Sequence, residues 1–263
     1  IDQFGQKVDI DKDTIVVWAE REASNQTTIT NGTGSSSDNS NQYSGAVYVY
    51  TRSGTSWSQQ SYIKSSNNDA NDNFGYSMSI DGDTLAVSAQ GEDSNQNTIT
   101  NGSTSSDDNS AAYSGAVYIY TRSGTDWSQQ AYIKPSNAVA NGGFGSSVSL
   151  KGDILVVGAQ GEDSNSTSIV NGFTASLDTS RGNSGAVYVF KRSGTSWSQI
   201  AYIKAVNADA SDAFGGKTDL DNSTIVVGAN SEDSNSTSII NGTTASSDNS
   251  NSGNGAAYIY RFY

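Results

Sequence analysis

The chain contains no cysteine and no histidine among its 263 residues, and it has only one proline. Without cysteine there is no disulfide framework, thiolate zinc site or cysteine nucleophile. Without histidine there is no imidazole metal ligand and no histidine acid–base catalyst. These two absences exclude much catalytic and metal chemistry before any motif is considered.

Positive charge is also scarce, because 14 Lys and Arg residues stand against 27 Asp and Glu residues, for a net charge of -13. Phosphate binding needs clustered basic side chains, so we expect no nucleic-acid partner. No apolar run approaches the roughly 20 residues of a membrane span, and we expect no membrane insertion.

The polarity of the chain comes mostly from uncharged residues, since only 16% of the residues are charged and 34% are hydrophobic. This differs from the highly charged composition of disordered chains. An uncharged polar surface without thiols suits an extracellular or cell-surface protein. Because Ile1 directly precedes a repeat motif, we interpret the sequence as a mature or excised segment.

A Phe-Gly pair recurs at a constant spacing of 70 residues, beginning at Phe4, Phe74, Phe144 and Phe214. The chain is therefore an array of four copies of one unit. We expect a single domain, residues 1–263, built from repeats 1–70, 71–140, 141–210 and 211–263.

Short apolar runs bounded by Gly, Asp, Asn and Ser predict four β-strands in each repeat and no helix. Examples are Tyr76–Ile80, Thr84–Ala89, Gly45–Tyr50 and Trp57–Lys64. Radial repetition of four-stranded antiparallel sheets is typical of β-propellers. The predicted fold is all-β, a four-bladed β-propeller; the alternative is that two chains close one larger ring.

The same residues carry a family resemblance. The Phe-Gly pair, the strand endings Gly158-Ala159-Gln160 and Gly228-Ala229-Asn230, and the run Gly45–Tyr50 resemble the FG-GAP repeat of integrin α-subunit propellers and of bacterial and archaeal surface proteins. The resemblance implies a propeller fold and an extracellular or surface location. Integrin-type domains usually have seven blades, and two copies here depart from the Gly-Ala motif with Trp18-Ala19 and Ser88-Ala89.

Long connections between the second and third strands of each repeat form the next feature, at residues 20–44, 90–114, 160–184 and 230–254. Each contains an Asn-Gly pair, which is a hairpin signal, so we predict a polar hairpin arm on every blade. The chain is also rich in Asn-x-Ser/Thr motifs, which are candidates for glycosylation. These candidates are Asn25, Asn31, Asn101, Asn165, Asn222, Asn235 and Asn241.

Some FG-GAP repeats carry a calcium loop between the first two strands, but tight turns such as Asp81-Gly82-Asp83 are too short for 6 to 8 oxygen ligands. A second acidic set lies in the long connections, and it would converge on calcium if each loop folded back. The alternative is that these acids cap turns and solvate the surface. The candidates are Glu92, Asp93, Asp108, Glu162, Asp163, Asp178, Glu232, Asp233 and Asp248. We predict that no cofactor is required, and calcium is compatible with the sequence.

No catalytic residue is predicted. Paired carboxyl groups could in principle serve a glycosidase, but the four copies are near equivalents and no nucleophile lies beside a base. We therefore expect that the protein is not an enzyme.

The fourth repeat is 17 residues short and lacks the strand that corresponds to Trp57–Lys64. Its last strand should leave an open edge, and an unpaired edge invites pairing with another chain. That edge is Ala256, Ala257, Tyr258, Ile259 and Tyr260. We predict a self-assembling structural protein of the cell surface or matrix, glycosylated and a filament subunit, with copies of itself as partners. The alternative is an adhesin or lectin-like module whose long loops bind glycans or surface proteins with calcium.

Overall fold

The computed structural model describes residues 2–262, and within that range the regular structure consists of β-strands. No helix in those residues is long and apolar enough to cross a membrane. The strands form four antiparallel sheets, one for each repeat.

Three of the sheets have five strands in the same spatial order. The first sheet runs β1 (Phe4–Asp11), β2 (Thr14–Ala19), β4 (Ala46–Ser53), β5 (Ser56–Ile63) and β3 (Thr30–Asn31). The second runs β6 (Phe74–Asp81), β7 (Thr84–Ala89), β9 (Ala116–Ser123), β10 (Asp126–Ile133) and β8 (Thr100–Asn101). The third runs β11 (Phe144–Lys151), β12 (Ile154–Ala159), β14 (Ala186–Ser193), β15 (Ser196–Ile203) and β13 (Ile169–Asn171).

The fourth sheet has three strands, in the order β16 (Phe214–Asp221), β17 (Thr224–Ala229) and β18 (Ala256–Arg261). Within residues 2–262 no strand pairs with the outer edge of β18, as the short fourth repeat predicts. The long loop of this sheet also forms no short strand in those residues, unlike the loops of the other three sheets.

The Phe-Gly pair marks an irregularity at the start of each sheet. In the second sheet the pairing of β6 with β7 shifts between Phe74 and Met78. Gly75 adopts a φ of 105°, and a Cβ at this position would collide with the ring of Trp18 in the preceding sheet. Glycine is required here because the backbone is left-handed and neighbouring sheets approach closely.

The hydrophobic core lies between successive sheets. One cluster joins Val16 and Val49 of the first sheet to Phe74, Ile80 and Leu85 of the second. Phe74 is fully buried, and its ring packs edge-on against a tyrosine of β9. Burying such a ring contributes roughly 1.5–3 kcal/mol, so each junction between sheets is a major source of stability.

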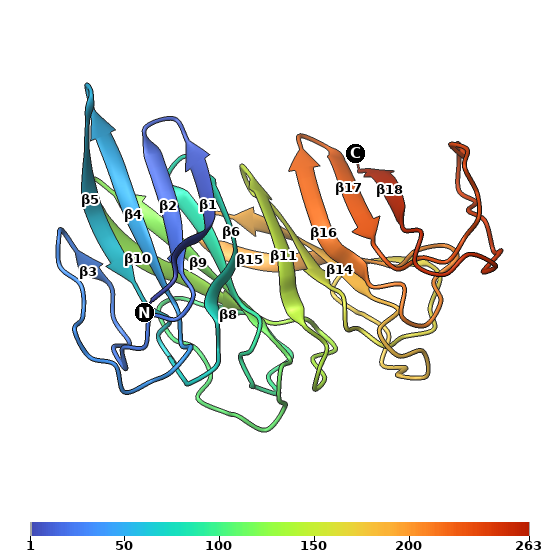
Figure 1. Ribbon diagram of the computed structural model, residues 1–263, viewed down its shortest axis with the longest axis horizontal. Helices are drawn as coiled ribbons and strands as arrows, with labels where there is room; N and C mark the ends of the chain where they lie inside the picture. Colours follow the sequence, from blue (N-terminus) through green and yellow to red (C-terminus); the bar gives the residue numbers. More distant parts are fainter. Residues whose placement is uncertain (1, 263) are drawn as a thin grey trace.

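The four sheets form an open array (Figure 1). The first strands β1, β6, β11 and β16 run through its middle, and successive ones pack against each other. The other strands of the first sheet extend to one side in this view, and those of the fourth sheet to the opposite side. Phe4 is exposed while Phe214 is buried, so among residues 2–262 no sheet covers the first sheet in the way that each later sheet is covered. The closed four-bladed ring predicted from the sequence is not confirmed.

The predicted hairpin arms are not confirmed either. Each long loop of the first three sheets instead turns back along the outer edge, where β3, β8 or β13 pairs with the last long strand. In the first sheet Thr30 is opposite Tyr62, and the backbone amide of Gly32 donates to the carbonyl of Gln60 at 2.6 Å. The Asn-Gly pair thus ends a fifth, two- to three-residue strand.

Candidate functional site

A buried glutamate–lysine pair ties each long loop to the last strand of its sheet. The lysine Nζ lies 2.8 Å from the glutamate Oε2 in Lys64–Glu22 and 2.7 Å in both Lys134–Glu92 and Lys204–Glu162. Each lysine also donates to a buried serine hydroxyl at 2.7 Å. Since the lysine follows the last long strand and the glutamate follows the second strand, the pair fixes the start of the loop against the sheet.

The second sheet shows how this carboxylate is satisfied. Tyr132 donates to Oε1 of Glu92 at 2.7 Å, and the backbone amide of Ser94 donates to Oε2 at 3.2 Å. Burial lowers the pKa of Lys134, while the adjacent Glu92 opposes that shift. Burial and the same carboxylate raise the pKa of Tyr132 above its usual range. A buried ion pair needs such additional hydrogen bonds to balance the cost of desolvation.

Glu232 of the fourth sheet is the exception. It is as buried as its three equivalents, and its carboxylate accepts from the Asn207 side chain at 2.9 Å and from the Ser234 amide at 3.1 Å. Among residues 2–262 no lysine or arginine forms an ion pair with it. In the other sheets this shell includes a tyrosine from the last long strand and the lysine that follows that strand, and residues 2–262 contain no equivalent strand in the fourth sheet.

The edge next to Glu232 is unpaired within the described chain. β18 pairs with β17 on one side, as in Val226 with Ile259, and no described strand lies on its other side. Tyr258 donates to Asn207, which itself binds Glu232, so the edge strand and the buried carboxylate form one connected region. Ile239 and Ile240 in the adjoining loop are exposed, and they stand where other loops form β13 or its equivalents.

The predicted calcium ligands have partners within the protein. Glu92 and Glu162 face lysines, whereas the neighbouring Asp93 and Asp163 accept from loop backbone amides at 2.7 Å. Asp108 and Asp178 accept from the amides of Asn95 and Asn165 at 2.8 Å, and these hydrogen bonds lower the pKa of both carboxyl groups. In the fourth sheet Asp233 and Asp248 accept from the amides of Gly253 and Ser250.

No set of three or more acidic side chains is arranged to hold a metal ion within residues 2–262. The turn-capping alternative describes the Asp contacts, and lysine pairing accounts for the glutamates in the first three sheets. Calcium binding stays a prediction.

All seven candidate glycosylation asparagines are exposed, but two have structural roles. Oδ1 of Asn31 accepts from the amide of Trp127 at 2.9 Å, and Asn101 contacts Trp197 in the same way at 2.8 Å. Their side-chain nitrogens donate to the carbonyls of the same tryptophans. Because each contact crosses from one sheet to the next, a glycan on Asn31 or Asn101 would break a tie between sheets. Asn235 donates to the hydroxyl of Ser250 within its own loop at 3.0 Å. Asn25, Asn165, Asn222 and Asn241 are the better placed candidates.

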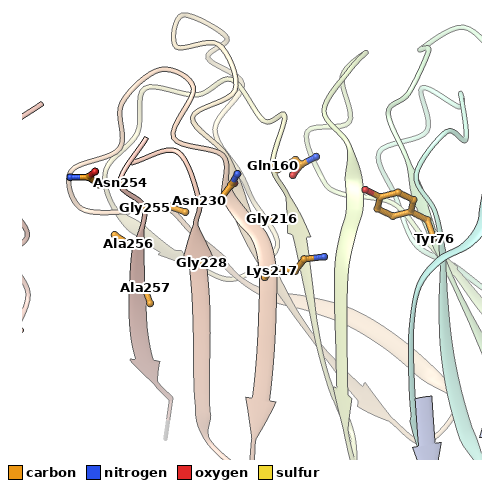
Figure 2. A pocket seen from close by; sticks show the side chains of 11 residues that line it. Tyr76, Gln160, Gly216, Lys217, Gly228, Asn230, Asn254, Gly255, Ala256 and Ala257 are labelled. Carbon is orange, nitrogen blue, oxygen red and sulfur yellow. The ribbon is translucent and has the colours of Figure 1, made fainter. Parts of the chain in front are cut away.

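Two hollows lie among the sheets. The larger, of about 660 Å³, opens beside the first strands, and Figure 2 shows Tyr76 and Lys217 pointing toward one another across it. Lys7 donates to the carbonyl of Tyr76, and burial together with the charge of Lys217 lowers the pKa of Lys7 to about 8. The fourth sheet therefore comes within electrostatic range of the first although no close packing covers Phe4.

The buried lysines are the residues that sequence reasoning missed. Lys64, Lys134 and Lys204 recur at the same 70-residue spacing as the glutamates, so a signal was present. Their place at the end of the half-polar strand Trp57–Lys64 and its equivalents gives no local sign of burial, and only the folded loop reveals the partner.

A comparison with known protein families agrees with this architecture. A family model described as FG-GAP repeat matches residues 57–120 and 127–172. No curated protein matches the chain. FG-GAP repeats generally occur in extracellular or surface proteins and are usually non-catalytic. The model thus identifies FG-GAP repeats at residues 57–120 and 127–172, which supports the resemblance seen in the sequence, and the Phe-Gly pair recurs in the same register in all four sheets.

Proposed function

We propose that the protein is a non-catalytic structural component of the cell surface or extracellular matrix that assembles with copies of itself through the edge of β18. The observation that carries the proposal is Glu232, a buried carboxylate beside an unpaired strand. Residues 1–263 act as one domain, copies of the chain are the partners, and no cofactor is required.

The three complete sheets define what would fill this edge. In each of them the last long strand pairs with the strand equivalent to β18 and ends in Tyr-Ile-Lys, whose tyrosine and lysine bind the buried glutamate in the second and third sheets. Strand addition satisfies the open edge with main-chain hydrogen bonds, and side-chain pockets give it specificity. A strand from another copy with this ending would supply the cation that Glu232 lacks.

A synthetic peptide copying residues 57–64 tests the proposal. We expect it to bind the 263-residue chain and to inhibit filament or particle formation seen by negative-stain electron microscopy. A peptide carrying Lys64→Met should bind at least tenfold more weakly, because it leaves the carboxylate unpaired. In the Glu232→Gln chain this difference between the peptides should shrink. If the peptide neither binds nor changes assembly, the proposal is wrong.

Glycosylation of the assembled protein is part of the same proposal. The exposed side chains of Asn25, Asn165, Asn222 and Asn241 leave room for a glycan without breaking a contact between sheets. Glycosylation is measured by comparing the intact mass of native protein before and after enzymatic deglycosylation. Equal masses would show that the protein carries no N-glycans.

A second candidate function, an adhesin or lectin-like module, is favoured by the smaller hollow of about 260 Å³. It lies between loops of the second and third sheets and is lined by Gln90, Tyr113, Asn141, Gln160 and Asn183. Amide groups and an exposed aromatic ring are suited to sugar hydroxyls and ring faces. Binding on a glycan array that Tyr113→Ala abolishes would support this function. Loss of binding on calcium chelation would support the calcium prediction.

A further inference from the structure

The two end sheets of the array expose faces that are buried everywhere else in the molecule. On the first sheet Phe4 is 55% exposed and Ile10 is 59% exposed, whereas Phe74 and Ile80 at the same repeat positions are 0% and 6% exposed. On the fourth sheet Ile259 is 69% exposed, whereas its equivalent Val49 is 0% exposed. Apolar groups concentrated on two end faces indicate an interaction surface.

These two faces are the two halves of an interface that the chain already forms three times. We call the face of a sheet that carries its Phe-Gly phenylalanine the front, and the opposite face the back. Inside the molecule, the front of each later sheet packs on the back of the sheet before it. The first sheet presents an unused front and the fourth sheet an unused back. Since both are copies of paired surfaces, the back of one molecule is complementary to the front of a second.

Hydrogen bonds between first strands point to the same pairing. Asp9 accepts from the backbone amide of Ile80 at 2.8 Å, and Asp11 accepts from that of Gly82 at 2.8 Å. The equivalents in the fourth sheet, Asp219 and Asp221, are exposed. In a second copy stacked with the same repeat register, their carboxylates would face the amides of Ile10 and Lys12.

The two unused faces set the number of copies. Figure 1 shows the first and fourth sheets on different sides of the central first strands, so the array is open between its ends, and two is the smallest number of copies that can cover every end face. A second copy, rotated by half a turn about the axis along these strands, would place its fourth sheet on the first sheet of its partner and its first sheet on the fourth.

We propose that two copies close one ring of eight sheets, with the Phe4 and Ile10 face of each copy packed on the Val226 and Ile259 face of the other. The contact deepens the proposed self-assembly but uses the faces of the end sheets rather than the edge of β18. Each ring would carry two β18 edges on its rim, through which rings could join. The ring and the strand addition can therefore fail separately.

Sedimentation equilibrium of the 263-residue chain tests the ring, in the presence of excess peptide 57–64 so that the β18 edge is blocked. The expected mass is twice 27.5 kDa. Ile10→Asp and Ile259→Asp should each weaken the dimer at least tenfold while leaving a folded monomer by circular dichroism. Leu177→Asp, at an exposed apolar position in the long loop of the third sheet, is the matched control and should leave the dimer unchanged.

A monomer at the highest attainable concentration would overturn the proposal, and so would a dimer that Ile10→Asp and Ile259→Asp both leave intact. An open series of oligomers in the presence of the peptide would show that the faces do not close a ring. Failure of peptide binding alone, with a stable dimer, would count against the β18 edge and leave the ring supported.

Discussion

Each lysine of a buried pair lies 42 residues beyond its glutamate and reaches it across the start of a long loop. At the scale of the residue, losing one partner of this contact costs more stability than losing an apolar contact, because both charges are desolvated and each compensates the other. Tyrosine, serine and backbone partners complete the site in the second and third sheets, so the pair specifies how the loop enters the structure.

Removing one partner of the pair should be costly. We predict that Lys134→Met lowers the free energy of unfolding by about 3–5 kcal/mol, since Glu92 is left buried and uncompensated. The double variant Glu92→Gln with Lys134→Met should lose less than the sum of the single variants. Urea unfolding measures all three. Arg52→Met is the control, because its pair with Asp13 is exposed and should contribute at most about 1 kcal/mol.

Asp72 provides a second prediction at the residue scale. Burial raises its pKa to about 8 in the folded protein, although the Asp69 amide donates to its carboxylate. The unfolded chain releases the proton near pH 4, so between about pH 4 and 8 the folded state holds more protons than the unfolded state. Stability should therefore fall as pH rises through this window, by at most about 1.4 kcal/mol per pH unit.

Asp72→Asn should abolish that loss, because the amide is neutral at every pH and can still accept from Asp69. Thermal unfolding between pH 4 and 8 measures the slope. The matched control is Asp212→Asn, whose effect should end near pH 6, because burial raises the pKa of Asp212 to about 6. An Asp72→Asn protein with the slope of the parent would contradict the assignment.

At the scale of the element, the alternation of apolar and polar residues, together with the turn residues, predicted the strands closely. The strand predicted at Thr84–Ala89 is observed with the same bounds, and Trp57–Lys64 differs from β5 by one residue at each end. The hairpin arms predicted for the long loops are not confirmed, and the prediction rested on Asn-Gly, which is a local signal. The loop segments Thr30–Asn31 and Thr100–Asn101 instead found a partner in the outer edge of β5 or β10, a non-local contact that single-sequence patterns do not encode.

The Phe-Gly phenylalanines give a prediction at this scale, because identical residues occupy different environments. Phe144→Ala should lower the free energy of unfolding by about 3–5 kcal/mol, since the ring is buried between the second and third sheets. Phe4→Ala in monomeric protein should cost far less, because that ring already contacts water. Chemical denaturation of an Ile259→Asp background, which we expect to be monomeric, isolates the two effects. Equal losses would show that Phe4 is covered in the monomer.

At the scale of the whole molecule, the number of sheets followed from the repeat, but the closure of the ring did not. Four Phe-Gly pairs predict four sheets whatever their relative rotation. That rotation depends on how side chains such as Trp18 and Tyr76 pack between neighbouring sheets. The centroids of these two rings are 6.0 Å apart. A spacing of 70 residues contains no information on this angle, so an open array and a closed ring are equally compatible with the sequence.

The net charge of -13 leads to the last prediction, which concerns how association depends on salt. Two copies that meet through apolar faces bring like charges together, and salt screens that repulsion over a Debye length of about 10 Å at 0.1 M. Raising sodium chloride from low to physiological concentration should therefore strengthen the dimer, with the largest gain below about 0.1 M. Sedimentation velocity at fixed protein concentration measures the shift. A dimer that weakens with salt would indicate an interface held by opposite charges, and the packing of Ile10 on Ile259 could not then be its main source of affinity.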